Sequence, residues 1–246
     1  MQATFEHKQA AHCENGAIVN LLKNKGYAIS EPMAFGLGSG LFFVYLPFIK
    51  VNHAPAISYR PLPGMIFNRL SKNLGIKIKR QKFSNPAKAQ KALDENLAQN
   101  RVTGLLVGVY HLPYFPDEYR FHFNAHNIVV YGKEDGKYLI SDPVLDYTVS
   151  LTEAELEKVR YAKGALAPNG HMYYPTYIPE QLNFEPAIRK AIKKTCRDML
   201  APMPIVGVRG MRMVAKSILK WHKKLGTAKT NYYLANMVRM QEEIGT

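Results

Sequence analysis

Cysteine and tryptophan are nearly absent from this chain of 246 residues, which has two cysteines and one tryptophan. Two thiols do not make the disulfide framework of a small secreted domain. No apolar run approaches the ~20 residues of a membrane-spanning helix, and the first residues lack the basic and then apolar pattern of a signal peptide. Because 47% of the residues are hydrophobic, the chain can build a sizeable core. We therefore expect a cytoplasmic globular protein.

Acidic residues are also scarce, with 19 Asp and Glu against 33 Lys and Arg and a net charge of +14. The excess is uneven, since residues 185–246 carry thirteen Lys and Arg but four Asp and Glu. That segment therefore has a charge of +9, which leaves +5 for residues 1–184. A basic surface of this size favours an acidic partner, and nucleic acid, an anionic membrane and an acidic carrier protein are candidates. A solvated basic surface without a particular partner is the alternative.

Several binding motifs are missing. The sequence has no zinc-ligand spacing, no RNA-binding signature and no basic region followed by heptads, which argues against nucleic acid as the partner. We expect neither a metal nor another cofactor. The glycines at 36, 38 and 40 follow no clear strand and have no acidic partner downstream, so they indicate a tight turn rather than a nucleotide loop.

The hydrophobic pattern predicts helices and strands in a mixed order, which indicates an α+β fold. Expected helices lie at residues 13–25, 65–74, 86–98, 153–161, 185–201, 207–225 and 230–244. Expected strands lie at residues 42–49, 56–59, 76–80, 104–110, 127–132, 137–141 and 146–150. Residues 162–184 are rich in Pro and Gly and are interpreted as a connection. We expect a first domain over residues 1–175 and a basic helical region over residues 185–246.

Two local patterns make these predictions more specific. Asp135-Gly136 between two apolar runs is typical of an antiparallel hairpin, and Ser150 with Glu153 resembles a capping box at the start of a helix. In residues 207–225, one helix face collects five apolar residues, with cations elsewhere. These apolar residues are Val208, Met211, Val214, Ile218 and Leu219. A basic amphipathic helix of this kind either packs on its own domain or binds a membrane peripherally.

Cys13 is the most informative residue, because it begins the first predicted helix. The thiolate is the nucleophilic form of cysteine, and the positive end of a helix dipole favours it. Cys196 lies within a helical stretch with no His beside it, and we interpret it as an inert thiol. A base for Cys13 must be brought by the fold.

Eight histidines compete for the role of base. His126 precedes a strongly apolar strand, where its side chain can face a cleft. His122 lies between aromatic residues, and His111 lies on a Pro-containing loop. His12 is adjacent to Cys13, and neighbouring residues at a helix start point apart. His126 is favoured, with the others left as alternatives.

Asp142 ends the second strand of the predicted hairpin. In an antiparallel pair, the start of one strand lies beside the end of the next, so Asp142 is expected near His126. A carboxylate there would hold the imidazole in one tautomer and stabilise its protonated form. The alternative is that Asp142-Pro143 only starts a turn.

These segments together resemble a known family, the N-terminal domain of butirosin biosynthesis protein H. The resemblance rests on five stretches over residues 10–175, namely residues 12–17, 35–40, 126–130, 141–143 and 162–164. The helical tail resembles the uncharacterised helical domain that often follows. The resemblance implies a papain-like domain with an antiparallel sheet and an N-terminal nucleophile helix, similar to bacteriocin-processing peptidases. It also implies Cys13 as nucleophile, His126 as general base and acid, and Asp142 as the orienting acid.

One position departs from the related peptidases, which carry a Gln six residues before the Cys as an oxyanion donor. Here that position is His7. The backbone N–H of Cys13 is the first candidate donor, and the side chains of Gln9 and Asn15 are further candidates.

The named family member is an acyltransferase that uses an acyl carrier protein thioester. The resemblance therefore implies an acyl-enzyme on Cys13 and transfer to an amine or hydroxyl of a small-molecule acceptor, in secondary-metabolite or lipid biosynthesis. An acidic carrier protein suits the basic surface. A thioesterase or a cysteine peptidase with the same triad is the alternative, and a basic membrane-binding or nucleic-acid-binding module without catalysis is a third hypothesis.

Overall fold

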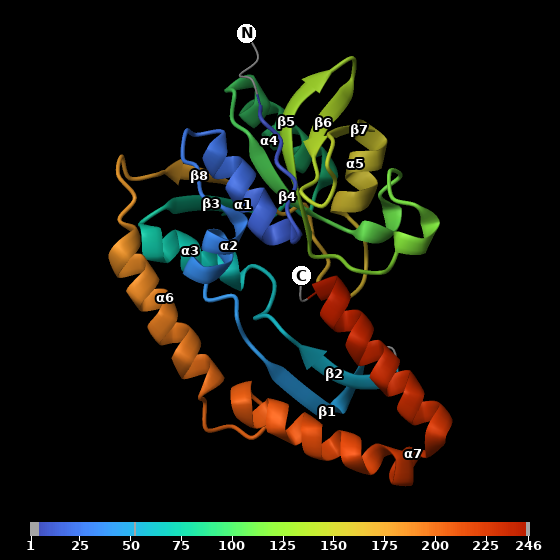
Figure 1. Cartoon of the computed structure of the whole chain (residues 1–246). Coiled ribbons are helices and arrows are strands. Elements are labelled where there is room, and N and C mark those ends of the chain that lie inside the picture. Colours follow the sequence, from blue (N-terminus) through green and yellow to red (C-terminus); the bar gives the residue numbers. More distant parts are fainter. Residues whose placement is uncertain (1–4, 52, 245–246) are drawn as a thin grey trace. The chain divides into compact units, whose positions relative to one another are not determined.

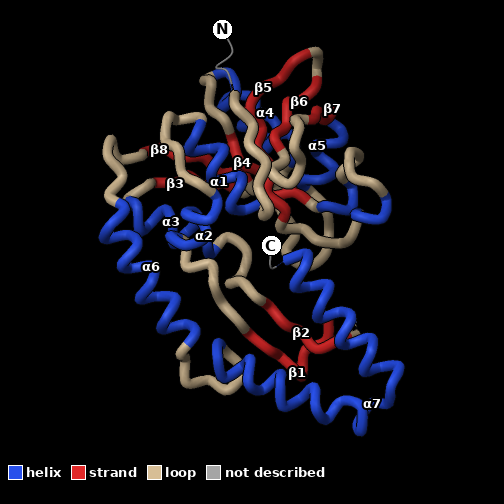
Figure 2. Tube along the Cα trace, viewed as in Figure 1, coloured by secondary structure: helices blue, strands red, loops and turns tan. Residues whose placement is uncertain are grey.

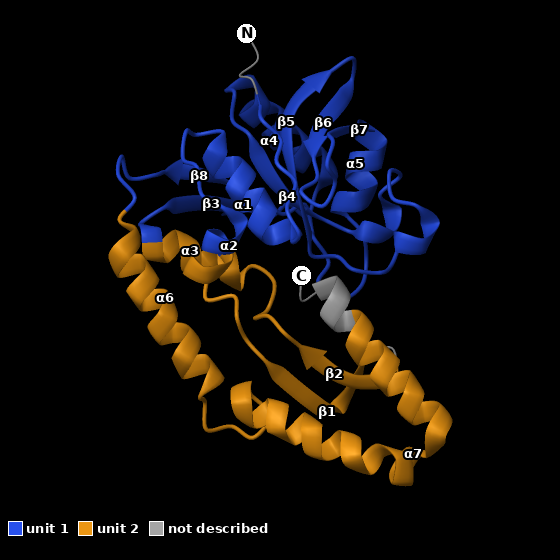
Figure 3. Cartoon of the chain, in the orientation of Figure 1, with its two compact units in different colours: residues 1–34, 74–182 blue, residues 35–73, 183–246 orange. Residues whose placement is uncertain are grey.

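A computed structural model describes residues 5–51 and 53–244. The chain forms two compact units, which Figure 3 colours separately. Unit 1 consists of residues 1–34 and 74–182, and unit 2 consists of residues 35–73 and 183–246. Each is described by itself below.

Unit 1 is built on a six-stranded sheet in the order β3-β8-β4-β5-β6-β7, and every pairing is antiparallel. Figures 1 and 2 show this sheet with helices beside it. Its strands are β3 (Lys77–Gln81), β4 (Thr103–Val107), β5 (His126–Glu134), β6 (Lys137–Ser141), β7 (Val149–Thr152) and β8 (Met172–Tyr177). The antiparallel sheet confirms the α+β class expected from the sequence.

Three helices cover this sheet, namely α1 (Cys13–Lys23), α4 (Pro86–Ala98) and α5 (Glu153–Arg160). Side chains alternate along β5, so its two faces meet different helices. Ile128 and Val130 join a buried cluster with Leu93 of α4 and Leu156 of α5. Asn127 points to the opposite face and contacts Cys13 of α1. The helix that begins at Cys13 therefore lies against β5, near the middle of the sheet.

The predicted hairpin is confirmed. β5 and β6 pair through Glu134 and Lys137, and Asp135 and Gly136 form the turn between them. Both turn residues have positive φ, 48° and 75°, which is the conformation that Asp-Gly favours in a two-residue hairpin. The hairpin fixes the register that brings the end of β6 beside the start of β5.

Two expectations for unit 1 are wrong. Residues 162–184 are not only a connection, because β8 lies inside them and enters the sheet between β3 and β4. We did not predict this strand because Pro175 lies within it. Pro175 pairs with Ile78 next to a register shift, where a missing N–H is tolerated. The capping box uses Thr152 and Glu155 instead of Ser150 and Glu153. Ser150 is unsuitable because it pairs with Leu139 inside the sheet.

Two short 3₁₀ turns, η1 (Val109–His111) and η2 (Asp117–Tyr119), follow β4. The helix α2 (Glu31–Leu37) leads along the chain from unit 1 into unit 2, and α3 (Met65–Leu74) leads back. Gly38, one of the spaced glycines, lies so close to Ile66 that an added Cβ would come within 2.4 Å of its Cγ2. Close packing is therefore the reason for this glycine.

Unit 2 contains the hairpin of β1 (Val44–Val51) and β2 (Ala54–Ser58) and the helices α6 (Phe184–Met199) and α7 (Gly207–Ile244). Its core joins the hairpin to α7 through Phe43, Tyr45, Ile57, Val214 and Trp221. This packing explains why residues 35–73, which we expected in the first domain, form one compact unit with the C-terminal helices.

The helical C-terminal region is confirmed. α7 is interrupted at Gly226, whose φ of 76° and ψ of 169° are not helical, so two helices meet near the predicted boundary. The predicted apolar face was partly wrong, because Met211 and Leu219 are 41% and 84% exposed. Val214 and Ile218 of the predicted face do pack into the core, and Trp221, which was not predicted, joins them. None of the described helices is both long enough and apolar enough to span a bilayer.

Candidate active site

Cys13 is the first residue of α1, as the sequence predicted. Its neighbour His12 has extended backbone angles and provides no side-chain cap. The first N–H groups of a helix have no partner within the helix, and in the described part of the chain no acceptor is found for the N–H of Cys13. The thiol is buried, with 8% of the residue exposed. A donor and the positive end of a helix dipole thus lie at the thiol.

The turn before Cys13 is fixed by a carboxylate. Glu31 at the start of α2 accepts hydrogen bonds from the N–H groups of Ala11 and His12, both at 2.8 Å. The N–H of Ala10 donates to the carbonyl of Pro143 at 2.7 Å. The segment leading to the thiol is therefore tied both to α2 and to the residue that follows Asp142.

Gly16 lets these parts approach one another. A Cβ at this position would come within 2.4 Å of the Cβ of Pro143 and 2.6 Å of that of Ala10. Gly16 lies one turn after Cys13 on α1, so any larger residue would press the helix away from the turn at Pro143. The glycine is a packing requirement of the site.

His126 and Asp142 meet as the hairpin register predicted. The Nε2 of His126 lies 2.7 Å from Oδ2 of Asp142, and the two residues are 5% and 0% exposed. A carboxylate only accepts, so Nε2 carries the proton of this bond. The Nδ1 atom is then left for the thiol, in agreement with a hydrogen bond between His126 and Cys13.

The imidazole of His126 favours its protonated form. Burial lowers its pKa, but the charges of Asp142 and Cys13 and the hydrogen bonds to both residues outweigh burial and raise the pKa to about 10. His126 therefore carries its proton at neutral pH while both neighbours are in place. Because Cys13 supplies part of this effect, any change at the sulfur changes the proton affinity of the imidazole.

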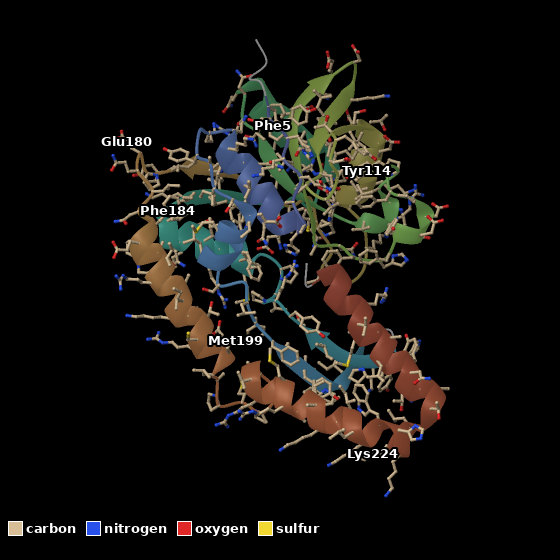
Figure 4. The ribbon with its side chains drawn as sticks, viewed as in Figure 1. Phe5, Tyr114, Glu180, Phe184, Met199 and Lys224 are labelled. Carbon is tan, nitrogen blue, oxygen red and sulfur yellow. The ribbon has the colours of Figure 1, made fainter. Side chains whose placement is uncertain are left out.

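Tyr114, which Figure 4 labels, follows η1 and contacts Asp142. Its hydroxyl donates to the same Oδ2 atom at 2.8 Å, and the N–H of Val144 donates to Oδ1 at 3.2 Å. Burial and the charge of Asp142 raise the pKa of Tyr114 well above its usual value, so it stays a neutral donor. Asp142 also accepts from Leu145 through its backbone carbonyl, so it starts a turn as well as contacting the imidazole.

On the other face of β5, Asn127 connects the sheet to the sulfur. Its Nδ2 donates to Sγ of Cys13 at 3.9 Å and to the carbonyl of Ala125 at 3.2 Å. The hydroxyl of Tyr173 on β8 donates to Oδ1 at 2.7 Å, which fixes the amide so that its NH₂ group faces the thiol. The amide of Asn127 thus places an N–H donor at the sulfur.

His7 occupies the position of the missing Gln but is engaged elsewhere. Its Nε2 donates to the carbonyl of Leu145 at 3.0 Å, and its Nδ1 accepts from Ser141 at 2.7 Å. Asn20 of α1 in turn donates to the hydroxyl of Ser141 at 3.2 Å. His7 thus supports the turn that carries Asp142 and has no ring nitrogen left for an oxyanion.

The two predicted side-chain donors lie in different surroundings. Gln9 is exposed, and its Nε2 is 3.5 Å from the carbonyl of Val144, a long contact. Asn15 is 2% exposed, and its Oδ1 is buried without a partner among the described residues. At 100° per residue, Asn15 leaves α1 on a different side from Cys13. The direction of Asn15 argues against it as a second donor, and Gln9 stays a candidate.

The other thiol belongs to unit 2, and two of the other histidines have partners of their own. Cys196 is exposed on α6 of unit 2. His122 stacks on Tyr110 with ring centroids 4.1 Å apart, and His111 contacts the edge of the same ring. Among the described residues, neither makes a hydrogen bond to Asp142, so His126 is the imidazole that the fold brings to Cys13.

Sequence reasoning missed Tyr114, Asn127 and Tyr173. Tyr173 lies in β8, within the residues that we interpreted as a connection. Asn127 follows His126 directly, and the alternation of side chains along β5 was the available signal that it faces α1.

Two family models match parts of this chain. Residues 12–143 match the family "Butirosin biosynthesis protein H, N-terminal", and residues 154–246 match a domain of unknown function, DUF4872. The search of curated proteins found no match.

Two solved structures are similar at low identity. One is described as a C39-like peptidase from Bacillus anthracis, with 14% identity, a TM-score of 0.46 and coverage of 74% of this chain and 97% of that one. The other is the peptidase domain of Streptococcus ComA, with 12% identity, a TM-score of 0.41 and coverage of 70% and 97%. The family model matches residues 12–143, which is more than half of the sequence. This chain therefore belongs to the butirosin biosynthesis protein H N-terminal family.

Proposed function

We propose that this chain is a cysteine-dependent acyltransferase that accepts an acyl group from an acyl carrier protein thioester. The observation that carries the proposal is the buried hydrogen bond between His126 and Asp142, beside a thiol at the start of α1 that is close enough to raise the pKa of His126. Family membership supports acyl transfer as the reaction. Cys13 is the nucleophile, His126 the acid and base, and Asp142 the residue that orients the imidazole.

The first half of the reaction acylates Cys13. The thiolate attacks the thioester carbonyl, and the N–H of Cys13 with the Gln9 amide stabilises the oxyanion. The intermediate then expels the sulfur of the donor, which takes the proton of His126 and leaves as a free thiol. The products are a Cys13 thioester and a neutral imidazole.

The second half depends on the change at the sulfur. Acylation removes the charge of Cys13, one of the causes that raise the pKa of His126. The imidazole is then a base whose Nδ1 takes the proton of an amine or hydroxyl as that group attacks the thioester. Collapse of the intermediate releases the amide or ester and restores the thiolate and the protonated His126.

The charge of unit 2 supports a carrier protein as the donor of the acyl group. Unit 2 is strongly basic, and carrier proteins are typically acidic, so electrostatic attraction would steer the encounter. High salt should then slow transfer from an acylated carrier protein while leaving turnover of a small thioester largely unchanged.

The test is intact mass after incubation with an acylated carrier protein. The expected result is an acyl adduct on the wild type and on Cys196→Ala, with none on Cys13→Ala. Addition of an amine should convert the adduct to an amide. An adduct that yields only free acid in the presence of amine would identify a hydrolase, and an adduct retained by Cys13→Ala would refute the mechanism.

A further inference from the structure

Almost all of the net positive charge of the chain belongs to unit 2. Residues 35–73 and 183–246 contain seventeen Lys and Arg and four Asp and Glu, a net charge of +13 out of +14. Unit 1 is therefore nearly neutral. Residues 35–73 contain no acidic residue at all. An anionic partner attracted by this charge meets unit 2.

Five of these cations form a stripe on the first half of α7. They follow one another at intervals of three or four residues and so share one helix face: Arg209, Arg212, Lys216, Lys220 and Lys224. At 1.5 Å per residue the stripe is about 22 Å long. Like charges at this spacing destabilise a helix, so a bound anion would stabilise α7.

The stripe borders a pocket of about 720 Å³, a size typical of small-molecule sites. Its opposite wall is the β1–β2 hairpin, and no acidic side chain is among the described residues that line it. Lys50 of β1 adds a sixth cation, whose Nζ lies 3.5 Å from the hydroxyl of Tyr233. Tyr45 and Trp221 form part of the floor, and both are almost completely buried.

An apolar bulge adjoins this pocket. The register of the hairpin passes from Leu46 opposite Ala56 to Lys50 opposite Pro55, so residues 47–49 have no partner in the ladder. Phe48 and Ile49 are 71% and 45% exposed, and the preceding Pro47 lines the pocket. Exposed apolar side chains beside cations are typical of sites that receive an anionic group with an attached hydrocarbon chain.

We propose that this pocket binds a phosphate ester that carries an apolar chain. The phosphate lies against the cations of α7 and Lys50, because guanidinium groups and ammonium groups bind its oxygens strongly. The chain lies along the bulge at Phe48 and Ile49. A polynucleotide fits less well, since the aromatic rings of the floor are buried and offer no platform on which bases stack.

Trp221 provides a direct measurement, because it is the only tryptophan of the chain and lines the pocket. We expect monomeric dihexanoyl phosphatidic acid to change the fluorescence of the full-length protein in a saturable manner. Combining K216Q, K220Q and K224Q should weaken binding at least about tenfold, since each lysine contributes to attraction of the phosphate. These side chains are exposed, and circular dichroism checks that the variant is folded.

A matched control removes the same charge elsewhere in unit 2. Lys190, Lys193 and Arg197 are exposed on α6 and do not line the pocket, so their replacement by Gln should leave the affinity unchanged. Equal weakening by the control would show nonspecific attraction and overturn the proposal. Tighter binding of an oligonucleotide than of the ester, or of inorganic phosphate as tight as the ester, would also overturn it.

Vesicles separate the two sources of such an ester. Phosphatidylcholine vesicles with and without phosphatidic acid are sedimented with the protein. A bilayer lipid is identified if binding requires phosphatidic acid and is lost in the combined variant F48S and I49S. The control L62S changes another exposed apolar residue and should keep binding. Binding of the monomeric ester alone identifies a free ligand. Absence of both overturns the proposal, whatever the outcome at Cys13.

Discussion

Tyr114 and His126 donate hydrogen bonds to the same atom, Oδ2 of Asp142, at 2.8 and 2.7 Å. The two donors arrive from different elements, one from the segment after η1 and one from the start of β5. The carboxylate is therefore held in place even when the imidazole changes its protonation state. Tyr114 is a positioning residue in this arrangement, since it acts through Asp142.

Tyr114→Phe should lower kcat for acyl transfer by about fivefold, the effect of one hydrogen bond of ~1 kcal/mol. Without this donor, Asp142 holds the imidazolium proton more strongly, so the pKa of His126 rises and the acid side of the pH profile of kcat shifts to higher pH. Steady-state kinetics from pH 6 to 10 measures both effects. Tyr110→Phe is the control, because Tyr110 stacks on His122 instead; a fall in kcat without a pH shift would reduce Tyr114 to a structural role.

The stability of the protein should depend on pH through His126. Its folded-state pKa of about 10 lies above the unfolded value of 6.5, so the folded protein binds more protons between these values. The stabilisation is complete below pH 6.5 and is lost as pH rises towards 10, with a slope of at most ~1.4 kcal/mol per pH unit for one proton. Urea unfolding of the wild type and His126→Gln should show a flatter profile for the variant. Parallel profiles would mean that His126 is neutral in the folded protein.

Gly16→Ala should destabilise the protein even though alanine is the better helix former. The new Cβ meets Pro143 and Ala10, and overpacking of this kind costs about 1–3 kcal/mol, more than the gain of up to ~1 kcal/mol in helix propensity. Gly36→Ala in α2 is the matched control, since nothing lies within 4 Å of its added Cβ. Chemical denaturation compares the two, and equal stability would contradict the packing argument.

Gln9→Ala should lower kcat by about 10²- to 10³-fold if its amide stabilises the oxyanion, without a matching loss of stability, because Gln9 is exposed. Asn15→Ala should lower the stability of the protein but leave kcat largely unchanged, because Asn15 is buried and leaves α1 on another side. Measuring kcat per folded molecule and the unfolding of each variant separates a catalytic role from a structural one. The reverse pattern would assign the donor role to Asn15.

The hairpin pairing was predictable because it depends on local sequence. Asp135-Gly136 sets the turn, and the antiparallel pairing that follows brings the end of β6, next to Asp142, near the start of β5 at His126. The position of Cys13 at a helix start was predictable for the same reason. The catalytic roles of these three residues stay predictions until activity is measured.

The contacts that the sequence could not reveal cross long separations along the chain. Tyr114 reaches Asp142 over 28 residues, and Tyr173 reaches Asn127 over 46. Neither hydrophobic periodicity nor a turn signal in the sequence predicts such pairs. β8 was missed because Pro175 is a strong local signal against a strand, whereas the register shift that tolerates it exists only in the paired sheet.

The position of β8 in the sheet also determines when the sheet can form during translation and where the chain can be truncated. β8 lies between β3 and β4 in the sheet, yet it is the last strand of the chain and begins 29 residues after the family match ends at 143. A fragment that ends at the family boundary would lack both β7 and β8 and would leave edges of β3, β4 and β6 open to aggregation. During translation the sheet cannot close until residue 177 has emerged, so a stalled or truncated product would expose these edges to other chains.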